Sequence, residues 1–506
     1  MKAVRLAFII AVLALAVFFF SSNEADPDLW GHLKFGQDIF ERLAVPQYDS
    51  YSYAASGARW INHEWLSELL FYGIFSVAGG AGLIVLKVVV GLLITFLIYA
   101  SVTRATDSIS LRALIIGACL SVVSYGFAVR PQIFTYLFFA GVVFCLAEYG
   151  QTGRPLRLWC LPVIFLLWCN LHGGFVAGIG ILALYALCKI FDRKAAGVLI
   201  PLTAVSVIAT LVNPYGIGMW GFLAESIGKT RPYIPEWGAV AFSGLFADYF
   251  VVVLFAALGV LFTKAKRSAF ETVALCIGLI LSLRHNRHIP LFAILVAFYI
   301  PRYAGSFAAD ALKRLEGRCP QKLVTAFFVC VALLSAVCAL DRGKTNPVAI
   351  EIPASRYPVN AVAFMKDNKI GGNIFCWFEW AEMCMREMPG SSKVFLDGRY
   401  ETVYGDDLIR GYFDVLYCKR SYKEYLREFP ETGVMLLHRE NPLANALLRD
   451  PDWTLVFSSG PACVYVKDTA GNRGVLEDLA NNRLAYNQKD PPYYWSADSE
   501  CPDGHR

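Results

Sequence analysis

The chain has 506 residues, of which 56% are hydrophobic and only 17% are charged, and its net charge is +5. Soluble globular proteins contain about 45–50% apolar and about 25% charged residues, so this composition excludes a purely soluble enzyme, a disordered protein and a fibrous protein. The basic residues occur in short clusters between apolar stretches rather than in one run, which argues against a nucleic-acid partner.

Long apolar stretches in residues 1–341 predict one domain of membrane-spanning helices, because a helix needs about 20 apolar residues to cross a bilayer. The first outer loop of this predicted domain covers residues 22–64. The first stretch ends in three phenylalanines without a small-residue cleavage site, so we interpret it as a retained helix rather than a signal peptide. Residues 65–79 are apolar but shorter, and Gly79 and Gly80 separate them from the next stretch, which predicts an interfacial or re-entrant helix. The eleven predicted spans are 4–21, 81–103, 111–128, 132–149, 156–171, 173–191, 196–213, 246–263, 269–284, 288–302 and 323–340.

Basic residues give the predicted orientation, because the cytoplasmic loops of membrane proteins are rich in Lys and Arg. Lys2 and Arg5 place the N-terminus in the cytoplasm, and with eleven spans every predicted inner loop is basic. We therefore expect a multi-pass membrane protein with its C-terminal domain on the extracytoplasmic side. If the host is a Gram-negative bacterium, the membrane is the inner membrane and that side is the periplasm.

Residues 342–470 predict an extracytoplasmic α/β domain, which a polar tail follows over residues 471–506. Apolar runs predict strands, and patterned segments between them predict helices. The sequence Ser-Ser-Gly-Pro at 458–461 predicts a hairpin turn between the last two strands. The strands are expected at 373–378, 393–397, 432–438, 453–458 and 462–467, and the helices at 358–368, 420–428 and 442–449. The predicted fold class is a multi-span α-helical membrane protein with a C-terminal α/β domain.

Polar residues gather in the predicted outer loops of residues 1–341. A charged side chain at bilayer depth costs at least about 2.5–3.5 kcal/mol, so these residues beside apolar spans predict one outer polar cavity. Asp26 and Asp28 form an acidic pair in the first outer loop, although Pro27 between them also fits a turn or a helix cap. The other candidates are His32, His63, Glu64, Arg130, His172, Glu236, Arg284, His285, Arg287 and His288.

Two features of the C-terminal domain leave their role open. Asp397-Gly398-Arg399 follows a predicted strand, where α/β domains place ligand groups, but the three residues also fit a structural turn. Cys376 and Cys384 are candidates for a disulfide in an oxidising compartment, whereas the absence of a CxxC pair argues against a zinc or thioredoxin motif.

Taken together, these features resemble the GT-C superfamily of integral-membrane glycosyltransferases, in which a first span, an acidic outer loop, an interfacial helix and further spans precede an outer domain. The phrases DPDLWGH, WINHEWL, VRPQIF, NLHGGF, NPYG and VFLDGR look like those of a bacterial GT-C-like group without an assigned substrate. Residues 377–380 read Trp-Phe-Glu-Trp and do not match the WWD motif of oligosaccharyltransferases, which argues against N-glycosylation of protein sequons.

The resemblance implies a sugar donor on a polyprenyl phosphate and transfer on the outer face, usually with inversion. Its acidic first-loop residues match Asp28, which we favour as general base, and Asp26. With His32 the same two residues are a candidate site for Mg²⁺ or Mn²⁺. Cations suit a leaving phosphate, and the candidates are Arg130, Arg284, Arg287 and His288. The remaining candidate substrate-binding residues are His63, Glu64, His172, His285 and Glu236.

Two other functions fit parts of the sequence. A transporter or flippase for a lipid-linked substrate would need a polar path into the cytoplasmic half of the membrane, where charged residues are few. A non-catalytic scaffold on the same fold would bind the donor without turning it over. The acceptor stays open among a protein, a lipid and a glycan.

Overall fold

The computed structural model describes residues 2–191, 197–242, 246–342, 346 and 348–495. Its contacts divide the chain into two compact units. The first, called the helical unit below, contains Met1–Asn23 and Ile84–Pro347. The second, called the mixed unit, contains Glu24–Leu83 and Val348–Arg506.

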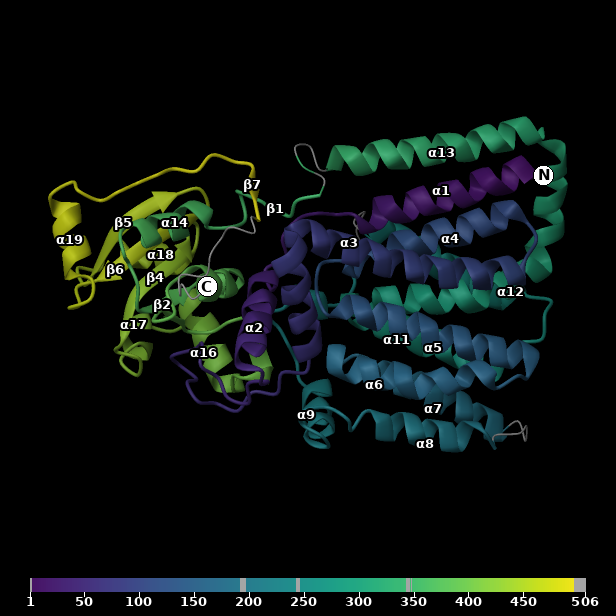
Figure 1. Ribbon diagram of the computed structural model, residues 1–506, viewed down its shortest axis with the longest axis horizontal. Coiled ribbons are helices and arrows are strands. Elements are labelled where there is room, and N and C mark those ends of the chain that lie inside the picture. The colour runs from purple at the N-terminus through teal and green to yellow at the C-terminus, as the bar shows by residue number, and fades with distance from the viewer. Residues whose placement is uncertain (1, 192–196, 243–245, 343–345, 347, 496–506) are drawn as a thin grey trace. The chain divides into compact units, whose positions relative to one another are not determined.

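Apolar helices build the helical unit, and Figure 1 shows them running side by side. Helix α13 packs along α1, with Phe8 and Phe328 in edge-to-face contact at 5.1 Å between ring centres, and α12 packs along α4. Each predicted span overlaps a helix, and residue 196, the first of the span 196–213, lies outside the described residues. The helices are α1 (Lys2–Phe20), the later part of α3 (Trp65–Ala105), α4 (Ile109–Val123), α5 (Gln132–Thr152), α6 (Leu161–Leu171), α7 (Phe175–Phe191), α8 (Leu199–Ala209), α9 (Gly218–Ile227), α10 (Ala247–Phe262), α11 (Ala269–Arg284), α12 (Ile289–Arg318) and α13 (Gln321–Arg342).

Several of these helices have the length and composition of membrane spans. Among the described residues, six helical segments are long and apolar enough to cross a membrane. They are Lys2–Phe20, Trp65–Ala105, Ile109–Gly126, Gln132–Thr152, Asn286–Ala308 and Gln321–Asp341. Shorter apolar helices occupy Leu156–Leu171, Phe175–Phe191, Leu199–Ala209 and Ala247–Phe262. The predicted class of a multi-span helical membrane protein is confirmed, and the number of eleven spans stays a prediction.

Helix α3 is interrupted at Gly79, as the sequence predicted for the end of the 65–79 segment. Gly79 has φ 58° and ψ −155°, a conformation that residues with a Cβ rarely adopt. The helix therefore consists of two pieces with different axes, and its first piece, from Trp65 to the kink, belongs to the mixed unit.

A five-stranded sheet forms the centre of the mixed unit, in the order β3-β2-β4-β6-β5. β2 pairs in parallel with β3 and β4, whereas β6 pairs antiparallel with β4 and β5. Gly460, at φ 57°, makes the predicted turn between β5 and β6. The strands are β2 (Asn373–Cys376), β3 (Lys393–Val394), β4 (Thr432–His438), β5 (Trp453–Ser459) and β6 (Ala462–Lys467), close to the five predicted runs.

Helices of the mixed unit follow the prediction less completely. The predicted helices correspond to α14 (Val359–Asp367), α17 (Tyr422–Tyr425) and α18 (Pro442–Leu447). Three helices of this unit were not predicted from the sequence: α2 (Leu29–Arg42), α15 (Ala381–Glu387) and α16 (Asp406–Leu416).

The first outer loop belongs to the mixed unit by its contacts, which differs from the predicted grouping of residues 1–341 in one domain. Ser52 lies alongside Val394 of β3 as a parallel bridge and its hydroxyl donates to the Phe395 carbonyl oxygen at 2.7 Å. Tyr53 shares a hydrogen bond with the hydroxyl of Thr432 at the start of β4. Helix α2 packs on α15. The loop thus continues the sheet beyond β3.

The polar tail contains more structure than its composition indicates. Helix α19 (Arg473–Ala480) and strand β7 (Tyr493–Tyr494) lie within it, and β7 pairs antiparallel with β1 (Glu351–Ile352). Residues 496–506 lie outside the described part of the chain. Cys376 and Cys384 are both buried and both free thiols, so the structure has no disulfide at this pair.

Candidate functional site

Asp28 occupies the N-terminal cap position of α2, but its side chain makes no capping hydrogen bond. Asp26 instead shapes the turn, because its Oδ1 accepts the backbone N–H of Asp28 at 3.1 Å. Both side chains are partly exposed. The two acidic residues of the predicted pair therefore differ: Asp26 has a local structural bond, and the carboxylate of Asp28 is not used to cap the helix.

Glu382 of α15 brings a second carboxyl group to Asp28. Its Oε2 accepts the backbone N–H of Gly31 at 3.1 Å, and its side chain is buried. A Cβ added at Gly398 would lie 2.6 Å from Glu382 Oε1 and 2.9 Å from Asp28 Oδ1. Both carboxyl groups thus reach the same glycine of the Asp-Gly-Arg turn, and any side chain there would displace them.

The environment of Glu382 favours its protonated form. Burial, and then the charges of Asp28 and Asp397, raise the pKa of Glu382 well above its ordinary value. A protonated Glu382 gives Asp28 a neutral neighbour instead of a second anion. No motif in the sequence marks Glu382, which lies more than 350 positions after Asp28, so only the fold could identify it.

Asp397 and Arg399, on either side of Gly398, form a buried ion network. The Arg399 guanidinium donates to both Asp397 oxygens, at 2.8 and 2.7 Å, and lies 2.6 Å from Asp49. The rings of Phe35 and Trp60 cover the guanidinium at 5.3 and 4.8 Å. Two carboxylates and aromatic faces therefore hold this turn, which supports its interpretation as structural for Asp397 and Arg399.

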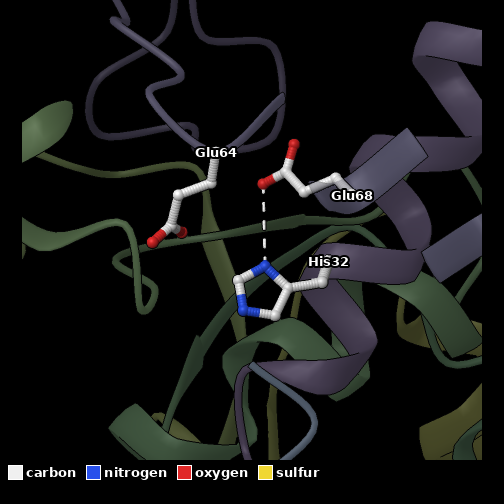
Figure 2. A group of neighbouring side chains, drawn as sticks. All are labelled: His32, Glu64 and Glu68. Carbon is white, nitrogen blue, oxygen red and sulfur yellow. Dashed lines mark ion pairs between the residues drawn. The ribbon is translucent and has the colours of Figure 1, made fainter. Parts of the chain in front are cut away.

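A second polar cluster of the mixed unit joins α2 to the start of α3. His32, Glu64 and Glu68 each direct one potential ligand atom to a common region, within 4.8 Å of one another (Figure 2). His32 Nδ1 lies 3.6 Å from Glu68 Oε1, and His63 Nε2 lies 3.6 Å from Glu64 Oε1. Burial lowers the pKa of His32, but Glu68, Glu64 and Asp28 together raise it above its ordinary value.

This cluster differs from the predicted metal site of Asp26, Asp28 and His32. Of those three residues, His32 belongs to the group that the described structure brings together, and Glu64 and Glu68 complete it. Glu68 was missed, although it lies four residues after Glu64 and such pairs share one helix face. The predicted set itself stays a prediction.

In the helical unit, Glu236 joins two of the predicted cations. Its Oε2 accepts from Arg130 at 3.2 Å, and its Oε1 accepts from Arg287 at 3.0 Å. The guanidinium of Arg287 also lies 5.3 Å from the ring centre of Trp237. The two guanidinium groups that meet at this carboxylate carry the planar N–H donors that suit an anionic ligand.

His172 adds a further hydrogen-bond donor to this group. Its Nδ1 accepts the backbone N–H of Gly174 at 2.9 Å and lies 2.7 Å from the hydroxyl of Thr135. Since Nδ1 accepts, a neutral His172 carries its proton on Nε2, which faces the Arg287 guanidinium at 3.4 Å. Both groups are hydrogen-bond donors on this side, and donors of this kind suit an oxyanion.

A cavity of about 320 Å³ adjoins Arg287 and Glu236. Aromatic and apolar side chains line much of it, together with Glu236, Arg287 and Asn286. The Oδ1 atom of Asn286 is buried and has no hydrogen-bond partner among the described residues. Such a lining fits a ligand with both an apolar and a polar part.

The remaining residues of the 284–288 cluster have other partners. His285 Nδ1 lies 2.7 Å from the Trp237 carbonyl oxygen, and His288 Nδ1 lies 3.4 Å from that of Leu281. Arg284 is exposed at the end of α11. The structure thus brings Arg287, Arg130, His172 and Glu236 together, and it does not bring Arg284 into that group.

Comparisons with known proteins give fold relatives. No family model matches the chain, and no curated protein does. The oligosaccharyltransferase AglB of Archaeoglobus fulgidus, solved with an inhibitory peptide and a dolichol-phosphate, superposes with a TM-score of 0.61 at 13% identity, over 92% of this chain and 74% of AglB. A second structure of that organism's oligosaccharyltransferase, tethered to an acceptor peptide, superposes with a TM-score of 0.54 at 13% sequence identity. The match covers 86% of this chain and 69% of the oligosaccharyltransferase.

ArnT of Cupriavidus metallidurans, solved with undecaprenyl phosphate, gives a TM-score of 0.51 at 10% identity, over 92% of this chain and 98% of ArnT. Identities this low show a common fold alone. AglB and ArnT are membrane glycosyltransferases of the GT-C superfamily, so the resemblance predicted from the sequence is confirmed, and the chain has the GT-C fold.

Proposed function

We propose that this chain is a membrane glycosyltransferase, which moves a sugar from a polyprenyl phosphate to an acceptor on the extracytoplasmic face with inversion. The observation that carries the proposal is Asp28, a carboxylate at the start of α2 that does not cap its helix and lies beside the buried acid Glu382. The fold supports it, because AglB and ArnT were solved with dolichol-phosphate and undecaprenyl phosphate.

In this proposal Asp28 acts as general base. The carboxylate takes the proton of an acceptor hydroxyl, and the oxygen attacks the anomeric carbon of the sugar. The bond from that carbon to the lipid phosphate breaks, and the phosphate leaves with the electron pair. A single displacement of this kind inverts the anomeric centre.

Arg130, Arg287 and His172 are proposed to bind the donor phosphate. The arginines supply charge, and the Nε2–H of His172 supplies a neutral donor. The adjoining cavity would take the first part of the lipid. Glu236 holds both guanidinium groups in place before the donor binds.

Replacement of Arg287 by Ala tests the phosphate site. A hydrogen bond to a charged group contributes about 1.5–3 kcal/mol, so we expect the Kd of Arg287→Ala for undecaprenyl phosphate to rise about 10- to 100-fold. Arg287→Lys keeps the charge but loses the planar pair of guanidinium donors. Its Kd should therefore lie between that of the wild type and that of Arg287→Ala. Titration calorimetry in detergent micelles measures these values.

Arg302→Ala is the matched control, because Arg302 also pairs with a glutamate of the helical unit, Glu271 at 3.6 Å. Its Kd should equal that of the wild type. Equal losses in Arg302→Ala and Arg287→Ala would contradict the phosphate site. Wild-type protein that binds a polyprenyl-phosphate sugar and never consumes it would instead support a scaffold.

A further inference from the structure

His32, the buried member of the cluster with Glu64 and Glu68, has an unsatisfied ring nitrogen. The side chain is 9% exposed, and Nδ1 has no hydrogen-bond partner among the described residues. Figure 2 shows this nitrogen pointing at the Glu68 carboxylate, with Glu64 on the same side. The dashed line in Figure 2 marks an ion pair of 3.6 Å between Nδ1 and Glu68 Oε1, a separation that is too long for a hydrogen bond. Buried polar nitrogens without a hydrogen bond are rare in proteins, and a bound ion or water commonly accounts for those that occur.

The spacing of these atoms matches two ligands of one metal ion. Zinc binds histidine nitrogen at about 2.0–2.1 Å and carboxylate oxygen at about 2.0–2.2 Å, so tetrahedral geometry separates the two atoms by about 3.4 Å. Octahedral magnesium, with ligands at about 2.0–2.1 Å, would separate neighbouring ligands by about 2.9 Å. The observed 3.6 Å is closer to the tetrahedral value.

The donor set also selects among metals. One imidazole and two carboxylates suit zinc, whereas magnesium and calcium prefer oxygen ligands alone. Asn62 orients the site from outside, because its amide donates to Glu68 Oε2 at 2.5 Å. Metal ligands commonly have such outer partners.

The geometry points to a zinc site formed by His32, Glu64 and Glu68, which ties α2 to the first piece of α3. Three protein ligands leave the fourth position of a tetrahedral ion for water. Asp28 precedes His32 by four residues, about one turn, so the ion would also fix the start of α2. The site is independent of the proposed sugar transfer, since zinc binding requires no donor.

Metal content tests the site directly. Full-length protein in detergent is stripped with EDTA, incubated with ZnCl₂ alone, and analysed by mass spectrometry of metals and by calorimetry. We expect His32→Asn and Glu68→Gln to bind zinc at least about 100-fold more weakly than the wild type, beyond the usual effect of outer-shell changes. At a zinc concentration 100 times Kd, the unfolding temperature of the wild type should rise by about 2–3 °C, and MgCl₂ should not change it.

Three further variants separate the possible outcomes. Glu64→Gln changes a partly exposed ligand and should also lose zinc, with circular dichroism confirming its fold. Asp26→Asn should keep wild-type affinity; loss there instead would support the ligand set of Asp26, Asp28 and His32. Glu428→Gln removes an exposed carboxyl group of the mixed unit and measures how much zinc binds nonspecifically to such groups. Wild-type zinc affinity in His32→Asn and Glu68→Gln would overturn the site, whereas failed sugar transfer with intact zinc binding would contradict only the proposed function.

Discussion

The protonation state of Glu382 sets the charge that lies next to Asp28. Two ionised acids beside one glycine would repel each other, and burial would penalise both charges. The raised pKa of Glu382 favours a shared proton on this pair over two negative charges. We therefore infer that Glu382 is a positioning residue, which supports α2 through the Gly31 amide.

Replacing Glu382 by Gln should make the protein less sensitive to alkaline pH. The unfolded chain releases the Glu382 proton near pH 4.3, whereas the folded protein retains it, so wild-type stability falls as the pH rises above that value. The slope from this one group approaches about 1.4 kcal/mol per pH unit. Glu382→Gln lacks this ionisable group and therefore its pH dependence. The unfolding temperature of the variant should exceed that of the wild type by a margin that grows from pH 5 up to the folded-state pKa of Glu382.

Glu379→Gln is the control for this series, because Glu379 lies one turn earlier and forms an exposed pair with Arg356. The difference in unfolding temperature between Glu379→Gln and the wild type should be smaller than that for Glu382→Gln, because the Glu379 side chain is exposed. A gap between Glu382→Gln and wild type that widens as the pH falls would contradict a protonated Glu382.

At the scale of elements, the break in α3 separates a segment of the mixed unit from a predicted span. The conformation of Gly79, at φ 58° and ψ −155°, is open to glycine and strained for other residues. Gly80 next to it lies against Ile350, where a Cβ would come within 3.2 Å. Two glycines therefore allow the chain to turn sharply inside an otherwise apolar helix.

Gly79→Ala should lower the free energy of unfolding by about 1–3 kcal/mol, since the added Cβ is strained in this conformation. Gly73→Ala, in the same helix, is the matched control: Gly73 has no atom within 4 Å of an added Cβ. A helical glycine replaced by alanine should gain about 0.5–1 kcal/mol. Chemical denaturation of both variants in detergent measures the difference, and equal effects at the two positions would show that the kink imposes no strain.

At the scale of the whole molecule, the mixed unit is assembled from two distant parts of the sequence. Residues 24–83 and 348–495 meet at the sheet edge beside β3 and at the buried Arg399. Arg399 binds Asp49 of the first part and Asp397 of the second. This ion pair is buried on both sides, so removing one partner would leave an uncompensated charge in the interior.

The sequence predicts the parts of this architecture that depend on local pattern. Apolar length marks the spans, and short apolar runs with a Gly-Pro turn mark the strands of the sheet. Composition alone does not reveal that the first outer loop joins the sheet, because that pairing uses backbone groups of Ser52 and Val394.

The residues of the candidate site also fall into those that the sequence identified and those that it did not. Arg130, Arg287, His172 and Glu236 stand out as polar residues among apolar ones, and the structure brings them together. Glu382 and Glu68 were missed because an acidic residue in a polar stretch has no distinctive signal. Their role depends on burial and on long-range contacts, which a single sequence does not record.

Asp28 is the proposed base for sugar transfer, and turnover with bound donor tests this role most directly. Purified protein in liposomes is supplied with undecaprenyl-phosphate-linked sugar and a membrane extract as acceptor, and released undecaprenyl phosphate is measured. Asp407→Asn, an exposed acid of the mixed unit, serves as control and should match the wild type. We predict that Asp28→Asn releases the lipid at least about 100-fold more slowly while binding as much donor by native mass spectrometry. Release by Asp28→Asn at the wild-type rate would contradict the account.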